Sequence, residues 1–137
     1  MEQRSVKAGV GVLVWKGGKV ALIKRTGSFG PDTWSPPGGH IEFGESALEA
    51  ARRETMEEIG VEIGNLKVLG FIEDISKDYG THYITIWVQS VWVSGELKAE
   101  DVEFTESGYF DIENPPKPLF ISFKNLLEGK MMPEKVL

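Results

Sequence analysis

The most constraining feature of this chain is a loop rich in glycine and proline that runs directly into a capped helix. Residues 27–44 contain three prolines and five glycines, a composition that predicts an ordered loop. Residues 46–59 form the strongest helix pattern in the chain. Ser46 and Glu49 make a capping box at its beginning, and Gly60 is a natural stop. The sequence therefore predicts an ordered loop that is followed directly by a helix with a capping signal at each end.

Three glutamates, Glu54, Glu57 and Glu58, lie on that predicted helix. Residues three and four apart are neighbours on a helix surface, so these carboxylates share one face and would repel one another. A multivalent cation such as Mg²⁺ turns that repulsion into binding, because hard cations prefer oxygen ligands. A solvated acidic face is the competing interpretation, although such a face more often mixes Lys with Glu. Spacing alone leaves both open.

The helical angle of about 100° per residue separates two faces of this helix. The glutamates share their face with small residues, Ala47, Ala50 and Ala51. A different stripe carries Leu48, Thr55 and Ile59, with Arg52 and Met56 beside it. We expect this second stripe to pack on a sheet. The acidic face would then lie against a space flanked by alanines, where a ligand can approach closely.

The rest of the chain predicts strands and one further helix, a mixed α+β pattern within a single domain, 1–137. Segments with β character are Val6–Trp15, Val20–Arg25, Leu66–Ile75, His82–Val93 and Glu106–Ile112. The turn at residues 16–19 predicts a hairpin between the first two. The segment beginning at His82 is apolar on both faces and is expected to be central. An amphipathic helix is predicted for Leu119–Glu128.

Composition narrows the classes of function. The 137 residues are 41% hydrophobic and include no cysteine, which excludes disulfides, thiolate zinc sites and cysteine nucleophiles and makes the cytoplasm the expected compartment. No long apolar run and no leader pattern is seen, so no membrane span is expected. The net charge of −6 argues against nucleic-acid binding through phosphates. A small anionic substrate remains compatible, because a bound cation reverses the local field.

The spacing of the charged residues resembles the Nudix box, whose pattern is G-x5-E-x7-R-E-U-x-E-E-x-G-U with U a bulky aliphatic residue. The matching positions are Gly39, Glu45, Arg53, Glu54, Glu57, Glu58, Gly60 and Val61. Thr55 departs from the pattern, where Ile, Leu or Val is usual. It lies on the apolar stripe, so we interpret the change as a packing variation. The preceding residues 34–39, WSPPGG, are similar to the family's W-x-x-P-G-G entrance.

This resemblance implies a Nudix-type α/β/α sandwich with a mixed β-sheet, a catalytic loop–helix and a C-terminal helix. It implies a hydrolase that cleaves a phosphoanhydride bond in a nucleotide, with Mg²⁺, or alternatively Mn²⁺, as cofactor and water as nucleophile. Carried over by position, the metal ligands are Glu54, Glu57, Glu58 and the Gly38 carbonyl. One of the three glutamates would also act as general base. Arg53 and Glu45 would orient the ligands.

Further site residues follow from the same resemblance. An extra carboxylate from outside the box is expected from Glu103 or Glu106, with Asp78 and Asp101 as weaker choices and a solvated acidic loop as the alternative. Lys24 and Arg25 match a position where relatives carry a basic residue, which would bind phosphate. The substrate-binding set is completed by Gly39, His40 and Tyr83. A slot for the base would draw on Phe29, Trp34, Tyr83, Trp87 and Phe120, although ordinary core packing is the expected role of most of these aromatic residues.

Two short segments, His40–Gly44 and His82–Ile86, look like the branch that converts a (d)NTP and water into (d)NMP and pyrophosphate. The alternatives are hydrolysis of ADP-sugars or dinucleoside polyphosphates. The lack of proline between Pro37 and Pro115 weakens the ADP-ribose alternative, and Tyr79 is interpreted as an ordinary loop residue. A non-catalytic nucleotide-binding regulatory module is disfavoured by the intact charged box. The expected partner is a small nucleotide, and homodimers are frequent among relatives.

Overall fold

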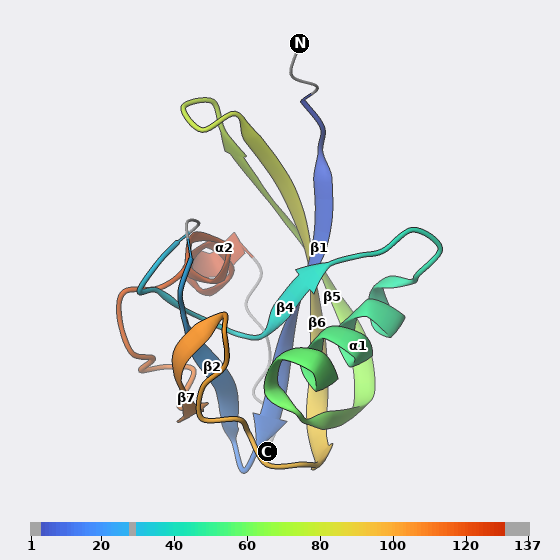
Figure 1. The fold of residues 1–137 in the computed structure, drawn as a ribbon, viewed down its shortest axis with the longest axis vertical. Coiled ribbons are helices and arrows are strands. Elements are labelled where there is room, and N and C mark those ends of the chain that lie inside the picture. The colour runs from blue at the N-terminus through green and yellow to red at the C-terminus, as the bar shows by residue number, and fades with distance from the viewer. Residues whose placement is uncertain (1–3, 28–29, 131–137) are drawn as a thin grey trace.

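The computed structural model describes residues 4–27 and 30–130, which form a mixed sheet with helices on both faces (Figure 1). The elements in chain order are β1 (Lys7–Lys16), β2 (Lys19–Arg25), β3 (Trp34–Ser35), β4 (Gly38–His40), α1 (Ala47–Ile59), β5 (Glu62–Ser76), β6 (Thr81–Ser94), β7 (Phe104–Phe110), α2 (Ile121–Asn125) and a helical turn at Leu126–Lys130. Among the described residues, no helix has the length and apolar composition needed to cross a bilayer.

The path through the sheet runs β3-β2-β1-β6-β5, with β4 paired to β1 and β7 paired to β2. Strand β1 is parallel to β6, and the other pairings are antiparallel. Strand β6 therefore lies between β1 and β5, as its two apolar faces predicted. The β1–β2 hairpin is also confirmed. Its turn has positive φ at both Gly17 and Gly18, the backbone that a tight two-residue turn requires.

One edge of β1 is shared by two partners. Strand β2 pairs with β1 only at Trp15 and Lys16, whereas β4 pairs with β1 at Gly9–Gly11. The two strands of the hairpin therefore diverge, and β4 occupies the gap that opens between them. Because β4 is part of the loop that precedes α1, its pairing with β1 fixes residues 38–40 of this loop against the middle of the sheet.

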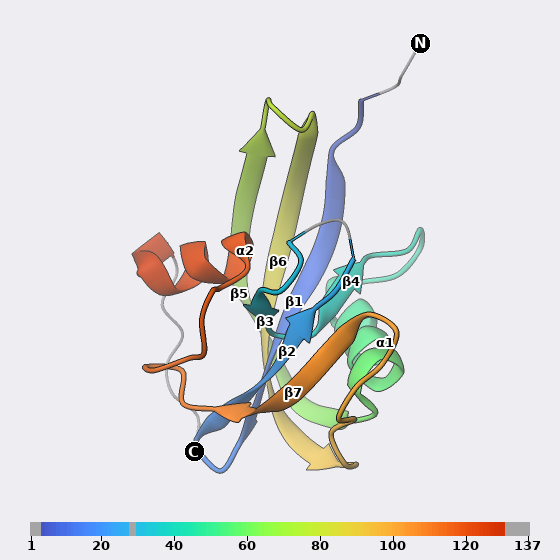
Figure 2. The same ribbon diagram turned by 60° about the vertical axis from the view of Figure 1, so that its left-hand side comes forward.

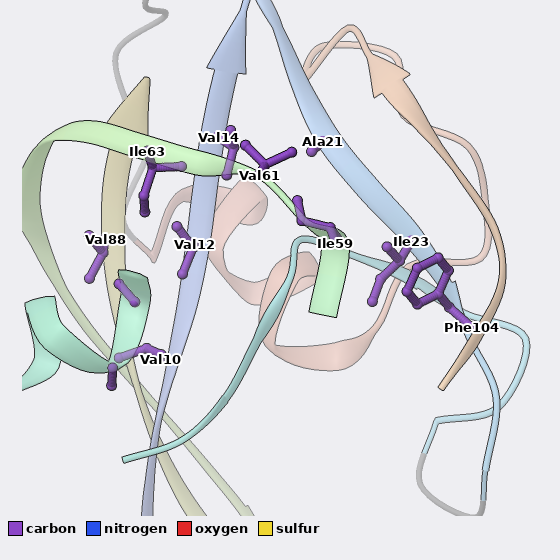
Figure 3. Close-up of a cluster of buried hydrophobic side chains, with 12 residues drawn as sticks. Val10, Val12, Val14, Ala21, Ile23, Ile59, Val61, Ile63, Val88 and Phe104 are labelled. Atoms are coloured by element: carbon purple, nitrogen blue, oxygen red, sulfur yellow. The ribbon is translucent and has the colours of Figure 1, made fainter. Parts of the chain in front are cut away.

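Alternate residues of β1 face two separate cores, as expected for a strand with side chains on both faces of a sheet. The α1-side core comprises Val10, Val12, Val14, Ala21, Ile23, Ala50, Ala51, Ile59, Val61, Ile63, Val88 and Phe104 (Figure 3). The α2-side core comprises Leu13, Trp15, Val20, Leu22, Trp34, Ile72, Trp87, Phe123 and Leu126. Figure 2 shows α1 and α2 on opposite sides of the sheet. The expected α+β sandwich is confirmed.

The predicted caps of α1 are present, but part of its predicted apolar stripe is wrong. Ser46 Oγ accepts a hydrogen bond from the backbone N–H of Glu49, and Gly60 ends the helix in the left-handed conformation. The buried residues of the helix are Ala50, Ala51, Thr55, Glu58 and Ile59, whereas Leu48 and Met56 are exposed. Small alanines let the helix approach the valines of the sheet closely, so the helix is rotated toward its alanine face.

Element boundaries differ modestly from the sequence expectation. The loop 27–44 contains the short strands β3 and β4, and β7 begins at Phe104, before the expected residue. Helix α2 starts at Ile121 and continues into a kinked turn that ends in non-helical backbone at Glu128 and Gly129. Backbone pairing with distant strands decides these boundaries, and such pairing leaves little trace in local composition.

Candidate active site

A cavity of about 670 Å³ lies where β4 crosses the split edge of β1. Its walls come from the end of β2, the strands β3 and β4 with the proline turn between them, helix α1 and the beginning of α2. Its floor is formed by β1, β5 and β6, including Gly9, Gly11, Thr85 and Trp87. We refer to this space as the cleft.

Glu58 is the most buried charged residue of the cleft, with 8% of its surface exposed. Its Oε1 accepts a hydrogen bond of 3.0 Å from the backbone N–H of Gly38. Burial raises the pKa of Glu58 to about 8. The Gly38 hydrogen bond opposes this rise, and the adjacent Glu103 carboxyl adds to it. Among the described residues, Glu58 forms no ion pair, so the cleft contains a buried carboxyl group whose charged form is disfavoured.

Glu54 lies against the backbone of Gly39 so closely that a β-carbon at that position would overlap its carboxylate. This contact explains why position 39 is a glycine, because any larger residue would displace the Glu54 side chain. Burial raises the pKa of Glu54, and the neighbouring Arg53 opposes that rise. Glu54 and Glu58 both line the cleft.

Arg53 ties the loop and the helix together. Its Nε and Nη2 donate to the two carboxylate oxygens of Glu45 at 2.7 and 2.9 Å, a bidentate pair. Its Nη1 donates to Glu54 at 2.8 Å and to Glu57 at 3.2 Å, and Nη2 also donates to the carbonyl of His40. The pairing with Arg53 lowers the pKa of Glu45 to about 2. One guanidinium therefore orients carboxylates from both segments.

Glu57 is the exception among the three helix glutamates. Its side chain is 62% exposed, it contacts Arg53, and it is outside the lining of the cleft. The side chains of Glu54 and Glu58, one turn apart on α1, are the two that face the cavity.

The two basic residues at the end of β2 point in different directions. Lys24 forms an ion pair with Glu106 at 3.3 Å, away from the cleft. Arg25 lines the cleft, with its guanidinium carbon 4.2 Å from the centre of the Phe120 ring. Burial lowers the pKa of Arg25, while Glu58 and Glu103 oppose this shift. Arg25 is therefore placed to face the same space as the carboxylates.

Of the two residues expected to supply an extra carboxylate, Glu103 and Glu106, only Glu103 lines the cleft. Glu103 lines the cleft and acts electrostatically on both Glu54 and Glu58. Glu106 is committed to Lys24. Asp78 and Asp101 lie outside the cleft lining. Among the expected acidic residues, Glu103 is the one that the structure brings to the two helix glutamates.

Aromatic residues line the cleft beyond the carboxylates. The His40 and Tyr83 rings stack with centroids 6.1 Å apart, and Trp87 and Phe120 contribute to the same lining. Trp34 is instead in the α2-side core, edge-on to Phe110. Phe29 is outside the described residues. The Trp87 ring packs against Gly11 on the neighbouring strand. A β-carbon at Gly11 would be 2.6 Å from the ring, so the ring fits there because Gly11 has no side chain.

Sequence reasoning missed three polar residues of the cleft, Ser35, Ser122 and Asp74. Within the described residues, side-chain atoms of Arg25, Ser35, Trp87 and Ser122 are buried without a hydrogen-bond partner, and all four residues line the cleft. An unpaired buried polar group costs roughly 1–3 kcal/mol, so a cluster of them indicates a place for a ligand. Asp74 also lines the cleft. Its position two residues after buried Ile72, on the same face of β5, was the available signal.

The donor set of the cleft suits a hard divalent cation. Glu54, Glu58 and Glu103 supply carboxylate oxygens, and burial raises the pKa values of Glu54 and Glu58, a penalty on the charged forms that a bound cation would relieve. Within residues 4–27 and 30–130, no three His, Asp or Glu side chains already converge closely enough to enclose an ion. The chemistry therefore fits Mg²⁺ or Mn²⁺, and ligation would require the carboxylates to move toward the ion.

The loop–helix and its acidic cleft define a class of phosphate-processing domain, and comparison with known proteins identifies the family. The model of the NUDIX domain family matches residues 6–128, so the chain belongs to the Nudix family. Members of this family are hydrolases that act on acid anhydrides. The family and the fold inferred from the sequence are thus confirmed.

Three similar proteins illustrate the range of the family. The ADP-ribose pyrophosphatase of Methanocaldococcus jannaschii is 35% identical over 79% of this chain, and the NAD-capped RNA hydrolase NudC of Pseudomonas aeruginosa is 33% identical over 78%. The aligned regions span only 63% and 37% of those two proteins. A MutT NUDIX hydrolase structure from Burkholderia pseudomallei superimposes with a TM-score of 0.84 at 24% identity, covering 92% of this chain and 98% of that one.

Proposed function

We propose that this chain, as a single domain, hydrolyses a phosphoanhydride bond in a small nucleotide with the help of Mg²⁺ or Mn²⁺. The principal reaction proposed is conversion of a nucleoside triphosphate and water into the monophosphate and pyrophosphate. The observation that carries this proposal is the pair of cleft carboxylates, Glu54 and Glu58, whose pKa values are raised by burial and which face the same space as Arg25.

The proposed roles follow from position. Arg25 would bind a phosphate oxygen, and Phe120 beneath its guanidinium keeps the group in place. Arg53 holds Glu54 in its orientation by a 2.8 Å hydrogen bond. The cation, when bound by Glu54, Glu58 and the Gly38 carbonyl, would neutralise phosphate oxygens and acidify the attacking water. A carboxylate of the cleft would accept the proton that this water releases.

A second candidate is cleavage of a nucleoside diphosphate linked to a sugar. The similarity to the ADP-ribose pyrophosphatase of M. jannaschii favours it, even though the proline spacing in this chain argues against that substrate. Dinucleoside polyphosphates form a third substrate group. Product analysis separates these reactions, because only triphosphate cleavage of this type yields a nucleoside monophosphate together with pyrophosphate.

The test is a substrate panel measured with and without Mg²⁺ or Mn²⁺, using wild type, Glu54→Gln, Glu58→Gln and the control Glu49→Gln. Glu49 is exposed in the first turn of α1 and is not part of the cleft lining. We expect cation-dependent turnover in wild type and in the control, and a loss of about a hundredfold or more in each cleft variant. Melting temperatures should stay close to wild type.

Two results would contradict the proposal in different ways. Wild-type turnover in both cleft variants would remove the carboxylates from the mechanism. If no substrate of the panel is cleaved but nucleotides raise the melting temperature, the chain is a nucleotide-binding module instead of an enzyme.

A further inference from the structure

One acidic group of the cleft has no role in the proposed phosphate chemistry. Asp74, on β5, lines the cleft, and its Oδ1 accepts a 2.7 Å hydrogen bond from the Nδ2 amide of Asn125 on α2. This contact joins the helix to the sheet and restricts the rotation of the carboxylate. Asp74 is therefore a fixed hydrogen-bond acceptor in a cavity wall.

The sheet order separates Asp74 from the catalytic glutamates. Gly39, against which Glu54 lies, is on β4, and the neighbouring strands in order are β1, β6 and β5. Three strand spacings correspond to roughly 14 Å. An extended nucleoside diphosphate can bridge such a separation. When its phosphates lie at the glutamates, its base reaches the part of the cleft that Asp74 borders.

The surroundings of Asp74 suit an aromatic ring system. Tyr83 is the cross-strand partner of Asp74 on β6 and stacks with His40. Ser122 lies three residues before Asn125, so the two residues share one face of α2. Ser122 is 3% exposed, and its Oγ is among the atoms without a hydrogen-bond partner in the described part of the chain. An acceptor and a hydroxyl are thus held close to aromatic walls.

We propose that Asp74, held by Asn125, recognises the edge of the nucleobase and selects bases that present two adjacent N–H donors, as guanine does. This inference rests on the proposed function for the location of the phosphates. An aspartate carboxylate accepts two parallel hydrogen bonds, from the ring N–H and the exocyclic amine of guanine. The Ser122 hydroxyl can donate to the neighbouring carbonyl oxygen of the same base.

Other bases match this pattern less well. Adenine and cytosine each present one exocyclic amine beside a ring nitrogen that is a hydrogen-bond acceptor. This nitrogen would face a carboxylate oxygen, which is also an acceptor, and the two would repel. Uracil presents a single ring N–H between two carbonyl oxygens. A half-buried carboxylate left partly unpaired weakens binding, so the unfavourable contact with a wrong base adds to the discrimination that the guanine contacts provide.

The experiment compares Asp74→Asn with Glu73→Gln, a control that removes one negative charge from the adjacent residue on the opposite face of β5. Glu73 is exposed and is not part of the cleft lining. Relative kcat/KM is measured for GTP, ATP, CTP and UTP. Binding of GMP and AMP without cation is measured by calorimetry. In Asp74→Asn, we expect the preference for guanine over adenine to fall about ten- to a hundredfold in both measurements. In the control, it should be unchanged.

The ratio between bases is measured on one preparation, so partial unfolding of a variant does not affect it. An unchanged guanine-to-adenine ratio in Asp74→Asn would overturn the inference while leaving the proposed function intact. Equal losses for all bases, together with weaker binding of 2′-deoxy forms to wild type, would assign Asp74 to the ribose and also overturn it. If no nucleotide is hydrolysed, the proposed function fails, and the GMP-to-AMP binding ratio still decides this inference.

Discussion

At the scale of single residues, burial makes two adjacent glutamates chemically different. Glu57 and Glu58 are neighbours in the chain, yet the side chain of Glu57 is 62% exposed whereas residue Glu58 is 8% exposed overall. Glu57 contacts the Arg53 guanidinium, while Glu58 accepts from Gly38 and lies beside Glu103. The pKa of Glu58 rises because water is excluded and a second carboxyl is close, so this residue should dominate the pH response of the cleft.

The stability of the cation-free protein should therefore depend on Glu58. Its pKa in the folded state, about 8, lies above the ordinary value of 4.5, so folding favours the neutral form. The contribution to the free energy of unfolding is full below about pH 4.5 and is lost as the pH rises through about 8. Urea unfolding in EDTA between pH 5 and pH 9 should show a fall for wild type and a flatter profile for Glu58→Gln. Parallel profiles would exclude Glu58 as the source.

At the scale of elements, helix α1 gains its beginning from Ser46 and its orientation from alanines. The Ser46 cap satisfies one of the free backbone N–H groups of the first turn, and Ala50 and Ala51 are fully buried against the sheet. The helix carries Glu54 and Glu58 into the cleft and holds Arg53 beside them, so any loosening of its first turn also loosens the Glu45–Arg53 pair that closes the loop.

Replacing the cap should have a measurable cost. Ser46→Ala removes the acceptor for the Glu49 N–H and should lower the free energy of unfolding by about 1 kcal/mol. Ser46→Asp keeps an acceptor at the same position and should stay within a few tenths of a kcal/mol of wild type. Urea unfolding of the three proteins measures both values. Equal destabilisation by Ala and Asp would show that the hydroxyl, and not the capping bond, matters.

At the scale of the whole molecule, the floor of the cleft is formed by residues of neighbouring strands that are distant in the chain. Gly11 on β1 faces Trp87 on β6 in the parallel register, and the ring occupies the space that a side chain at Gly11 would need. Trp87 thereby forms part of both the α2-side core and the floor of the cleft. The site and the fold depend on the same packing contact.

Replacing Gly11 with alanine should disturb both the fold and the floor of the cleft. Its β-carbon would lie 2.6 Å from the Trp87 ring, and such overpacking costs about 1–3 kcal/mol. In the double variant with Trp87→Leu, the smaller side chain relieves the overlap. The double variant should therefore lose less free energy of unfolding than the sum of the losses of the two single variants. A double-mutant cycle by urea unfolding provides the test. Strict additivity would mean that the two residues do not compete for space.

Sequence reasoning succeeded where structure is decided locally. The turn at Gly17 and Gly18, the caps of α1 and the two-sided apolar pattern of β6 all depend on residues close together in the chain. It failed for Leu48 and Met56, which are exposed, because helical periodicity separates faces but does not show which face meets the sheet. Ser35 stood at a variable position of the WSPPGG segment, and Ser122 and Asp74 stood in no motif; the three line one cleft only through strand pairing and helix docking.

The sequence by itself determined that a glycine-rich loop precedes a capped acidic helix, and the spacing from Gly39 to Val61 was sufficient to indicate the family. Only the tertiary structure decided which charged groups share a cavity. Glu103 and Arg25 face it, while Glu106 and Lys24 pair outside it: adjacent side chains of β2 point to opposite faces, and the register of β2 against β7 shifts between Lys24 and Arg25. Such a shift arises from contacts across about eighty residues of chain, beyond the reach of any local pattern.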